Sequence, residues 1–122
     1  MATTFSVARA QEGDVAVLAL NGYLDAHTAP HFEKTIQEEY DSGRVRILVD
    51  CAGLTYISSA GLGVFMSFVE DVREAGGDIK ICSLVPTVYQ VFEILGFPEI
   101  FEILPDRDAG LRRFSEASAK EA

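Results

Sequence analysis

Residues 45–69 read VRILVDCAGLTYISSAGLGVFMSFV and join two different hydrophobic patterns. Val45 and the run from Ile47 to Val49 form a short, nearly continuous apolar segment, which is typical of a strand covered on both faces in a parallel sheet. From Ser59 onward the apolar residues recur at helical spacing, at Leu62, Phe65, Met66, Val69 and Val72. The stretch therefore predicts a central strand that ends near Asp50, a loop over Thr55–Gly63 and a helix.

The same alternation of strand and helix patterns continues on both sides of this stretch. The further elements that we expect are strands at 5–7, 15–20, 79–82 and 100–103, and helices at 28–40, 88–95 and around 111–114. Strands that alternate with helices indicate a sheet with right-handed crossovers. The prediction is an α/β fold with a mixed, mainly parallel sheet of about five strands and about four helices.

The length and charge of the chain indicate a single domain and argue against partners that are nucleic acids or membranes. A chain of 122 residues fits one domain, expected to span 1–122 with an ordered core at about 4–116 and a frayed tail at 117–122. The formal charge of −9 would repel nucleic acid and anionic lipid. No apolar run approaches the roughly 20 residues of a membrane span, and the first residues resemble no signal peptide. We expect a cytoplasmic protein with neither nucleic acid nor a membrane as partner.

Cysteine and histidine do not form a recognisable metal motif. Cys51 and Cys82 lie far apart and make no Cys-x-x-Cys pair, so buried, reduced thiols are the simplest interpretation. His27 and His31 are four residues apart, but Pro30 lies between them and the tetrahedral ligand set is incomplete. The prediction is no metal and no cofactor.

Ser58 and Ser59 stand where a parallel strand leads into a helix, the place where ligand sites gather in open α/β sheets. The ordinary interpretation is structural: a serine caps the helix, and the glycines Gly61 and Gly63 allow close packing of helix on sheet. Spacing alone favours this interpretation over a reactive serine. A functional role therefore needs a further argument.

Two kinds of enzyme site are disfavoured. A Gly-x-Ser-x-Gly nucleophile elbow would need glycine at Ile57 and a later histidine, whereas both histidines precede the serines. A P-loop would need Lys followed by Ser or Thr after its last glycine, which this segment lacks. Weak binding of a nucleotide at the helix N-terminus is an alternative that the sequence does not exclude, because backbone amides there attract phosphate. We expect a protein that is not an enzyme.

A phosphate acceptor is the remaining role for Ser59. A phosphate there would add about −1.5 to −2 charge beside a helix N-terminus, where the helix dipole favours it. The fold would survive, whereas a partner packed on the first helical turn would meet a dianion. Phosphorylation could thus switch binding on and off.

The segment Leu54–Val64 resembles the signature loop of the STAS domain family, which includes bacterial anti-sigma factor antagonists. Gly22–Asp25 is similar to the family's early Gly-x-Leu-Asp segment, Gly76–Asp78 to the turn after its central helix, and 85–97 to its next helix. These matches cover nearly the whole domain in order. One departure is Ser58, where many members carry Asp.

The resemblance implies a function and a set of partners. In its unphosphorylated form the protein would bind an anti-sigma factor that is also a serine kinase, and so release a sigma factor. Phosphorylation at Ser59, with Ser58 as the alternative acceptor, would end this binding, and a PP2C-type phosphatase would reverse it. Asp25 would organise the loop. The contact residues would be Thr55, Tyr56, Ser58, Ala60, Gly61, Leu62 and Gly63, with core packing preferred for Val64 and Phe65.

A monomer suits a protein that must bind and release. The rival interpretation is a STAS module that binds a nucleotide, an anion or a subunit of a transport or secretion complex at the same helix N-terminus.

Overall fold

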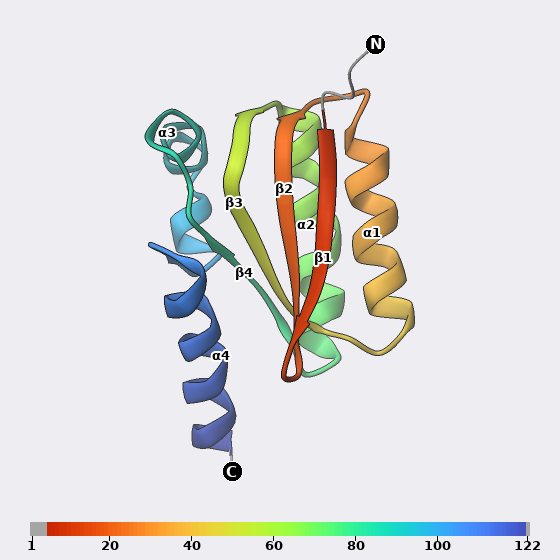
Figure 1. Ribbon diagram of the computed structural model, residues 1–122, viewed down its shortest axis with the longest axis vertical. Helices are drawn as coiled ribbons and strands as arrows, with labels where there is room; N and C mark the ends of the chain where they lie inside the picture. Colours follow the sequence, from red (N-terminus) through yellow and green to blue (C-terminus); the bar gives the residue numbers. More distant parts are fainter. Residues whose placement is uncertain (1–4, 122) are drawn as a thin grey trace.

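The computed structural model describes residues 5–121, with side chains described as far as residue 116 (Figure 1). Within this part the sheet has five strands in the order β1-β2-β3-β4-β5. The first pair is antiparallel and the other three pairs are parallel, which confirms the predicted α/β class. The strands are β1 Phe5–Glu12, β2 Val15–Leu24, β3 Arg46–Ile57, β4 Asp78–Cys82 and β5 Ile103–Leu104.

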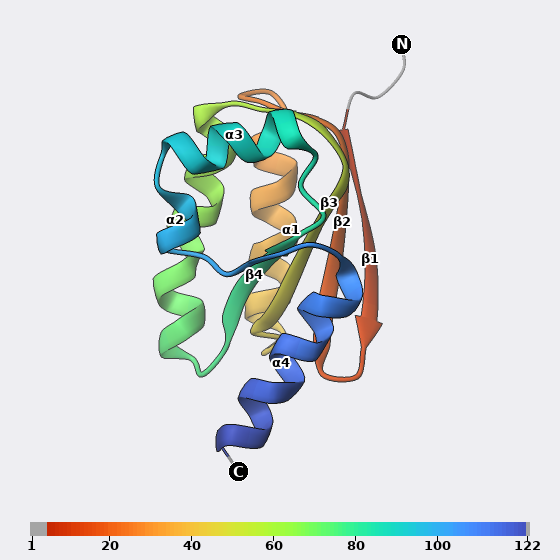
Figure 2. The same ribbon diagram turned by 90° about the vertical axis from the view of Figure 1, so that its left-hand side faces the viewer.

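Helices cover both faces of the sheet. On one face α1 and α2 lie side by side, whereas α4 packs on the other (Figures 1 and 2). The helix α3 lies at the end of the molecule that also holds the start of α2 (Figure 2). The bounds are α1 Ala29–Asp41, α2 Ser59–Glu74, α3 Pro86–Ile94, the 3-10 turn η1 Phe97–Glu99 and α4 Arg107–Glu121. The side chains of the tail lie outside the described residues, so its fraying and the 1–122 domain bounds stay predictions.

The central strand is longer than predicted. β3 does not end near Asp50 but runs on to Ile57, because its second half pairs with the end of β2. The register shifts twice along this pair, so Cys51, Leu54 and Ile57 reach one core although they are three residues apart. The predicted Thr55–Gly63 loop is therefore wrong: one residue, Ser58, separates β3 from α2.

The predicted strand at 100–103 is also displaced. Phe97 begins a 3-10 turn, and the backbone N–H groups of Ile100 and Phe101 both donate to its carbonyl. The rings of Phe97 and Phe101 stack with centroids 5.1 Å apart. This local aromatic packing delays the strand until Ile103.

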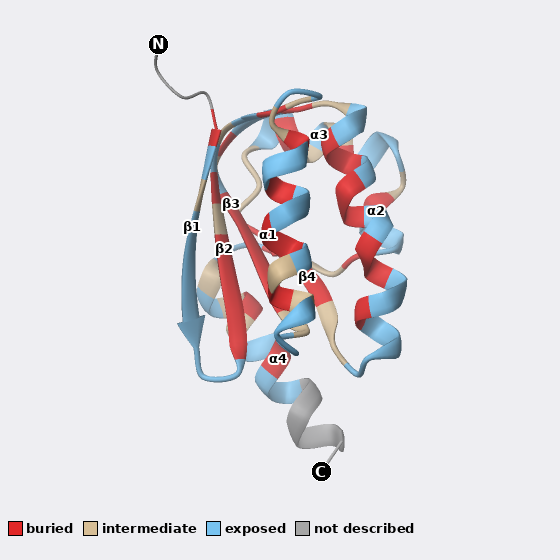
Figure 3. Ribbon diagram, turned by 90° about the vertical axis from the view of Figure 1, so that its right-hand side faces the viewer, coloured by how far each residue is buried: buried red, intermediate tan, exposed pale blue. Residues whose placement is uncertain are grey.

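Along α1 and α2 buried positions alternate with exposed ones (Figure 3), and the buried residues described form two hydrophobic cores. The larger one lies under α1, α2 and α3, where the Phe65 ring meets four other rings edge-on, those of Phe32, Phe92, Phe97 and Phe101. The smaller one lies under α4 and comprises Val15, Val17, Leu48, Cys82, Leu104 and Phe114. Burial of aromatic rings is among the largest stabilising contributions of a small domain.

Both cysteines are free and buried, as the sequence indicated. Cys51 belongs to the larger core and Cys82 to the smaller one, on opposite faces of the sheet. Burial raises the pKa of the Cys82 thiol to about 11 and that of Cys51 well above its usual value. Both therefore stay protonated thiols at neutral pH and are poor nucleophiles.

A buried carboxylate joins α1 to β1. Glu39 is 4% exposed and accepts hydrogen bonds from Arg9 on β1 and from Arg44 after the helix, at 2.5 Å in each case. Burial by itself would raise the pKa of the Glu39 carboxyl, but the hydrogen bonds from Arg44 and Arg9 outweigh it and hold that pKa below 4.5, its ordinary value. The ionised Glu39 carboxylate, bound by both arginines, thus favours the folded state.

We expect Glu39→Gln to lower the free energy of unfolding at neutral pH by about 1 to 3 kcal/mol, because the carboxylate that accepts two charged hydrogen bonds from Arg9 and one from Arg44 is lost. A lowered pKa contributes stability above the unfolded pKa, and that contribution is lost as the pH falls through the folded value. The variant should therefore lose less stability than the parent between neutral pH and pH 3. Urea unfolding at several pH values measures this. Glu33→Gln, on the exposed side of α1, is the control; equal acid slopes for Glu39→Gln and the parent would contradict the assignment.

Candidate functional site: the start of helix α2

The chain passes directly from the end of β3 into α2. Ser58 is the extended N-cap residue, and Ser59 is the first residue of the helix. The Ser58 N–H donates to the carbonyl of Leu24 at 2.9 Å, and the Ser58 carbonyl accepts from the N–H of Leu62 at 3.1 Å. The start of α2 is thereby fixed to the end of β2, beside the carboxyl ends of the parallel strands.

The two serines differ in access. Ser59 is exposed, whereas the Ser58 hydroxyl oxygen is buried and has no hydrogen-bond partner among the described residues. Ser58 is the N-cap by position, but its side chain makes no capping hydrogen bond, so the expected side-chain cap is wrong. A bulky reagent can therefore reach Ser59 and cannot reach the Ser58 oxygen without a rearrangement.

The two glycines of the segment also differ. A Cβ atom on Gly61 would lie 2.7 Å from Cγ of Leu24 and 3.0 Å from Cγ1 of Ile57, so glycine is needed for close packing of α2 on the sheet. A Cβ atom on Gly63 would meet nothing within 4 Å. The packing interpretation is thus confirmed for Gly61 and wrong for Gly63, whose small size leaves open space on the exposed face of the helix.

Asp25 organises the turn that leads into α1. Its Oδ1 atom accepts from the backbone N–H groups of His27 at 2.9 Å and Thr28 at 3.1 Å. Partial desolvation would raise the pKa of the Asp25 carboxyl, but these hydrogen bonds outweigh it and hold that pKa below its ordinary value. The Thr28 hydroxyl donates to the carbonyl of Tyr23 at 2.8 Å. All these bonds lie within residues 23–28, so Asp25 can reach the serine segment only through the neighbouring Leu24.

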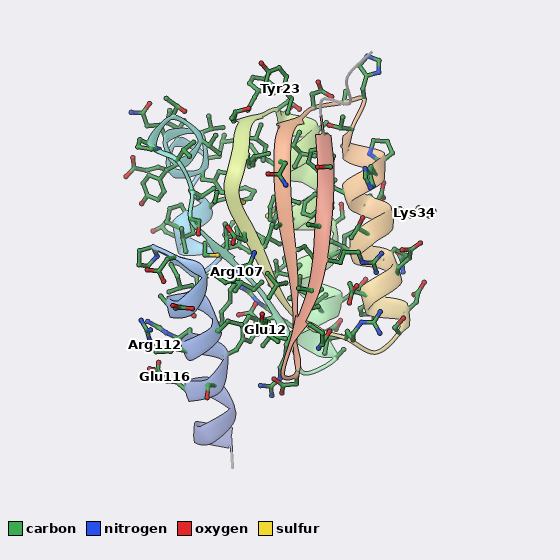
Figure 4. All side chains as sticks on the ribbon, in the orientation of Figure 1. Glu12, Tyr23, Lys34, Arg107, Arg112 and Glu116 are labelled. Atoms are coloured by element: carbon green, nitrogen blue, oxygen red, sulfur yellow. The ribbon has the colours of Figure 1, made fainter. Side chains whose placement is uncertain are left out.

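Two exposed tyrosines flank the serines. Tyr23 and Tyr56 are paired across β2 and β3, are 51% and 50% exposed, and contact each other edge-on with centroids 6.0 Å apart. Tyr23 lies at the end of the sheet opposite Glu12 (Figure 4). Sequence reasoning named Tyr56 but missed Tyr23, since the pairing of these two strands was not visible in the chain.

The other predicted contact residues divide by exposure. Thr55 and Ala60 are exposed, and the Thr55 hydroxyl donates to the carbonyl of Gly22 at 3.3 Å. Gly61 and Leu62 are buried, so they shape the site only from beneath. Val64 and Phe65 are buried as well, which confirms the preference for core packing.

The described residues offer no group of three or more His, Cys, Asp or Glu that could hold a metal ion. His27 precedes α1 and His31 lies within it, with its ring edge-on to Phe5 at 5.6 Å. In the part of the chain that the structure describes, no helix has the length and apolar character to cross a bilayer.

The fold and the site together define a class of small α/β domains with an exposed serine at the start of the helix that follows the central strand. The chain belongs to the STAS domain family, whose model matches residues 6–110. It is 35% identical over 101 residues to BtrV of Bordetella bronchiseptica, named as a candidate anti-sigma factor antagonist, covering 83% of this chain and 87% of BtrV.

A second curated relative supports the family, and a solved structure supports the fold. The anti-sigma-B factor antagonist of Bacillus subtilis is 28% identical over 102 residues, covering 83% of this chain and 91% of that protein. A crystal structure from Thermotoga maritima, titled as that of a candidate anti-sigma factor antagonist, superposes with a TM-score of 0.85 at 21% identity, over 89% of this chain and 94% of the other. The relatives are named for antagonising another protein, a binding role, in agreement with the prediction that this chain is not an enzyme.

The two glycines give a matched test of the local packing. Gly61→Ala should lower the free energy of unfolding by about 1 to 3 kcal/mol, because the new methyl group overlaps Leu24. Gly63→Ala should raise it by roughly 0.5 to 1 kcal/mol, since alanine loses less entropy than glycine in an open helix position. Urea unfolding of both variants measures the difference. Equal effects of the two alanines would show that α2 does not pack on Leu24 as described.

Proposed function

We propose that this protein is an anti-sigma factor antagonist controlled by phosphorylation of Ser59. In the unphosphorylated form it binds an anti-sigma factor that is also a serine kinase, and a sigma factor is released. Phosphorylation ends the binding, and a PP2C-type phosphatase restores it. The observation that carries the proposal is the exposed Ser59 at the start of α2, next to a Ser58 whose hydroxyl is buried.

Ser59 suits a phosphate acceptor for electrostatic reasons. The kinase would transfer the γ-phosphoryl group of ATP to the Ser59 oxygen, while the hydroxyl proton passes to a base of the kinase and ADP leaves. The product carries about −1.5 to −2 charge at the positive end of the α2 dipole. Because Ser59 is already exposed, the modification removes no buried contact and the fold is kept.

The phosphate on Ser59 would stay exposed to a partner, without a neighbouring cation from β3 or α2 to neutralise it. Residues 47–72 contain no Lys, Arg or His, so neither β3 beyond Arg46 nor α2 before Arg73 supplies a cation that could neutralise it. The surface beside it carries the exposed Tyr23, Tyr56 and Gly63, which a partner can cover closely while Ser59 is unmodified. A dianion at the centre of such a contact is costly to desolvate, and this cost releases the partner.

The first test is the site of modification. Incubation with the purified serine kinase and magnesium ATP should raise the intact mass by one phosphate, and peptide mapping should place it on Ser59. Ser59→Ala should stay at its unmodified mass. Ser58→Ala should still be phosphorylated, because the Ser58 oxygen is inaccessible. Phosphate on Ser58 in the parent protein, or equal modification of Ser59→Ala, would refute the acceptor assignment.

The second test is the switch itself. Ser59→Glu should weaken binding of the anti-sigma factor by about tenfold or more, as a charge placed within an interface does. Ser115→Glu adds the same charge to the exposed side of α4 and should leave the affinity near that of the parent. Isothermal titration calorimetry measures both. Unchanged binding by Ser59→Glu would favour the rival, a module that binds a nucleotide, an anion or a transport subunit.

A further inference from the structure

Four large apolar side chains are exposed on the part of the surface formed by α2, α3 and η1. Met66 is 44% exposed, Ile94 81%, Leu95 54% and Ile100 37%. Isolated exposed apolar residues are ordinary, but a group of them on one face indicates a contact surface. We call these four residues the α2–α3 ridge.

The ridge is continuous with the proposed switch. Ser59, Met66 and Arg73 are spaced by seven residues, about two helical turns, so they lie along one line on α2. At the far end of this line, Nη2 of Arg73 donates to the carbonyl of Ile100 at 2.6 Å, which holds the η1 turn against α2. Near the middle, Phe65 packs on Phe92 of α3 and so fixes α3 beside α2 (Figure 2).

The charge around the ridge is mainly negative. Residues 47–72 and 81–106 contain no Lys, Arg or His. The one cation on α2 is Arg73. Its Nε atom donates to Oδ1 of Asp78 at 2.8 Å, and its Cζ atom lies 5.9 Å from the centroid of the Phe101 ring. The elements that carry the four apolar side chains also carry exposed carboxylates, at Glu70, Asp71, Glu74, Glu93 and Glu99. Cations project from other parts of the molecule, such as Lys34 on α1 and Arg112 on α4 (Figure 4).

We infer that the α2–α3 ridge is a docking surface for a protein partner whose contacting surface is apolar at its centre and rimmed by Lys and Arg. The acidic rim disfavours two other occupants, because it would repel a second copy of this chain and anionic lipid alike. Since the ridge continues the line of Ser59, the same partner contacts both: the anti-sigma factor kinase. The inference rests on the proposed function and extends it to a second patch that phosphorylation does not touch.

The ridge is tested by substitutions that leave the core intact. Ile94→Ser removes the most exposed apolar side chain and should weaken binding of the purified anti-sigma factor kinase by about tenfold. Glu93→Lys reverses one charge of the rim and should slow association and lessen its dependence on salt. Glu33→Lys, the same exchange on the exposed side of α1, is the matched control and should change neither. Surface plasmon resonance at several salt concentrations gives the rates, and thermal unfolding confirms that each variant folds.

The outcomes separate the two proposals. Suppose that the kinase binds the parent protein and that Ser59→Glu lowers this affinity, whereas Ile94→Ser and Glu93→Lys bind as well as Glu33→Lys. The proposal that the ridge is a docking surface is then overturned, and the phospho-switch stands. If the kinase binds neither the parent protein nor Ser59→Ala, the proposed function is wrong, and the ridge proposal, which names this kinase as the partner, is wrong with it. Weaker binding by both ridge variants, with Ser59 still phosphorylated at saturating kinase, supports the ridge.

Discussion

The end of β2 is held against the first turn of α2, and the geometry of the candidate site depends on this contact. The Leu24 carbonyl accepts from the Ser58 N–H, and the Leu24 side chain fills the space beside Gly61. Together they fix where the helix begins and which serine turns outward. A larger residue at position 61 would move the helix from the sheet, because protein interiors are close-packed and leave little room for a methyl group.

The helix α2 connects the site to the rest of the molecule through its two faces. Its buried face places Phe65 among four aromatic rings, which bind α1, α3 and η1 to the same core. Its outer face carries Ser59 and Met66. Because the packing of Phe65 fixes the backbone of α2, binding of a partner to the outer face does not require the helix to be reordered, and this lowers the entropy cost of binding.

Much of the fold could be predicted, since burial imposes a period on the sequence. The apolar run Ile47–Val49 and the helical spacing after Ser59 gave the right elements in the right order. The end of β3 could not be predicted, because the register shifts against β2 break the regular alternation. The 3-10 turn at Phe97 was also missed, since ring stacking with Phe101 depends on a contact that no periodic pattern encodes.

The sequence by itself determined the class of fold, the family and the segment that carries the site, because hydrophobic periodicity and the Ser-Ser-Ala-Gly-Leu-Gly motif are local features. It ranked Ser59 above Ser58 only through the family resemblance, and it gave no sign that Tyr23 meets Tyr56 or that Ile100 lies beside α2. Only the tertiary structure decided these points. Access to a hydroxyl and the neighbours of a side chain depend on how distant segments pack, and packing is a property of the folded chain as a whole.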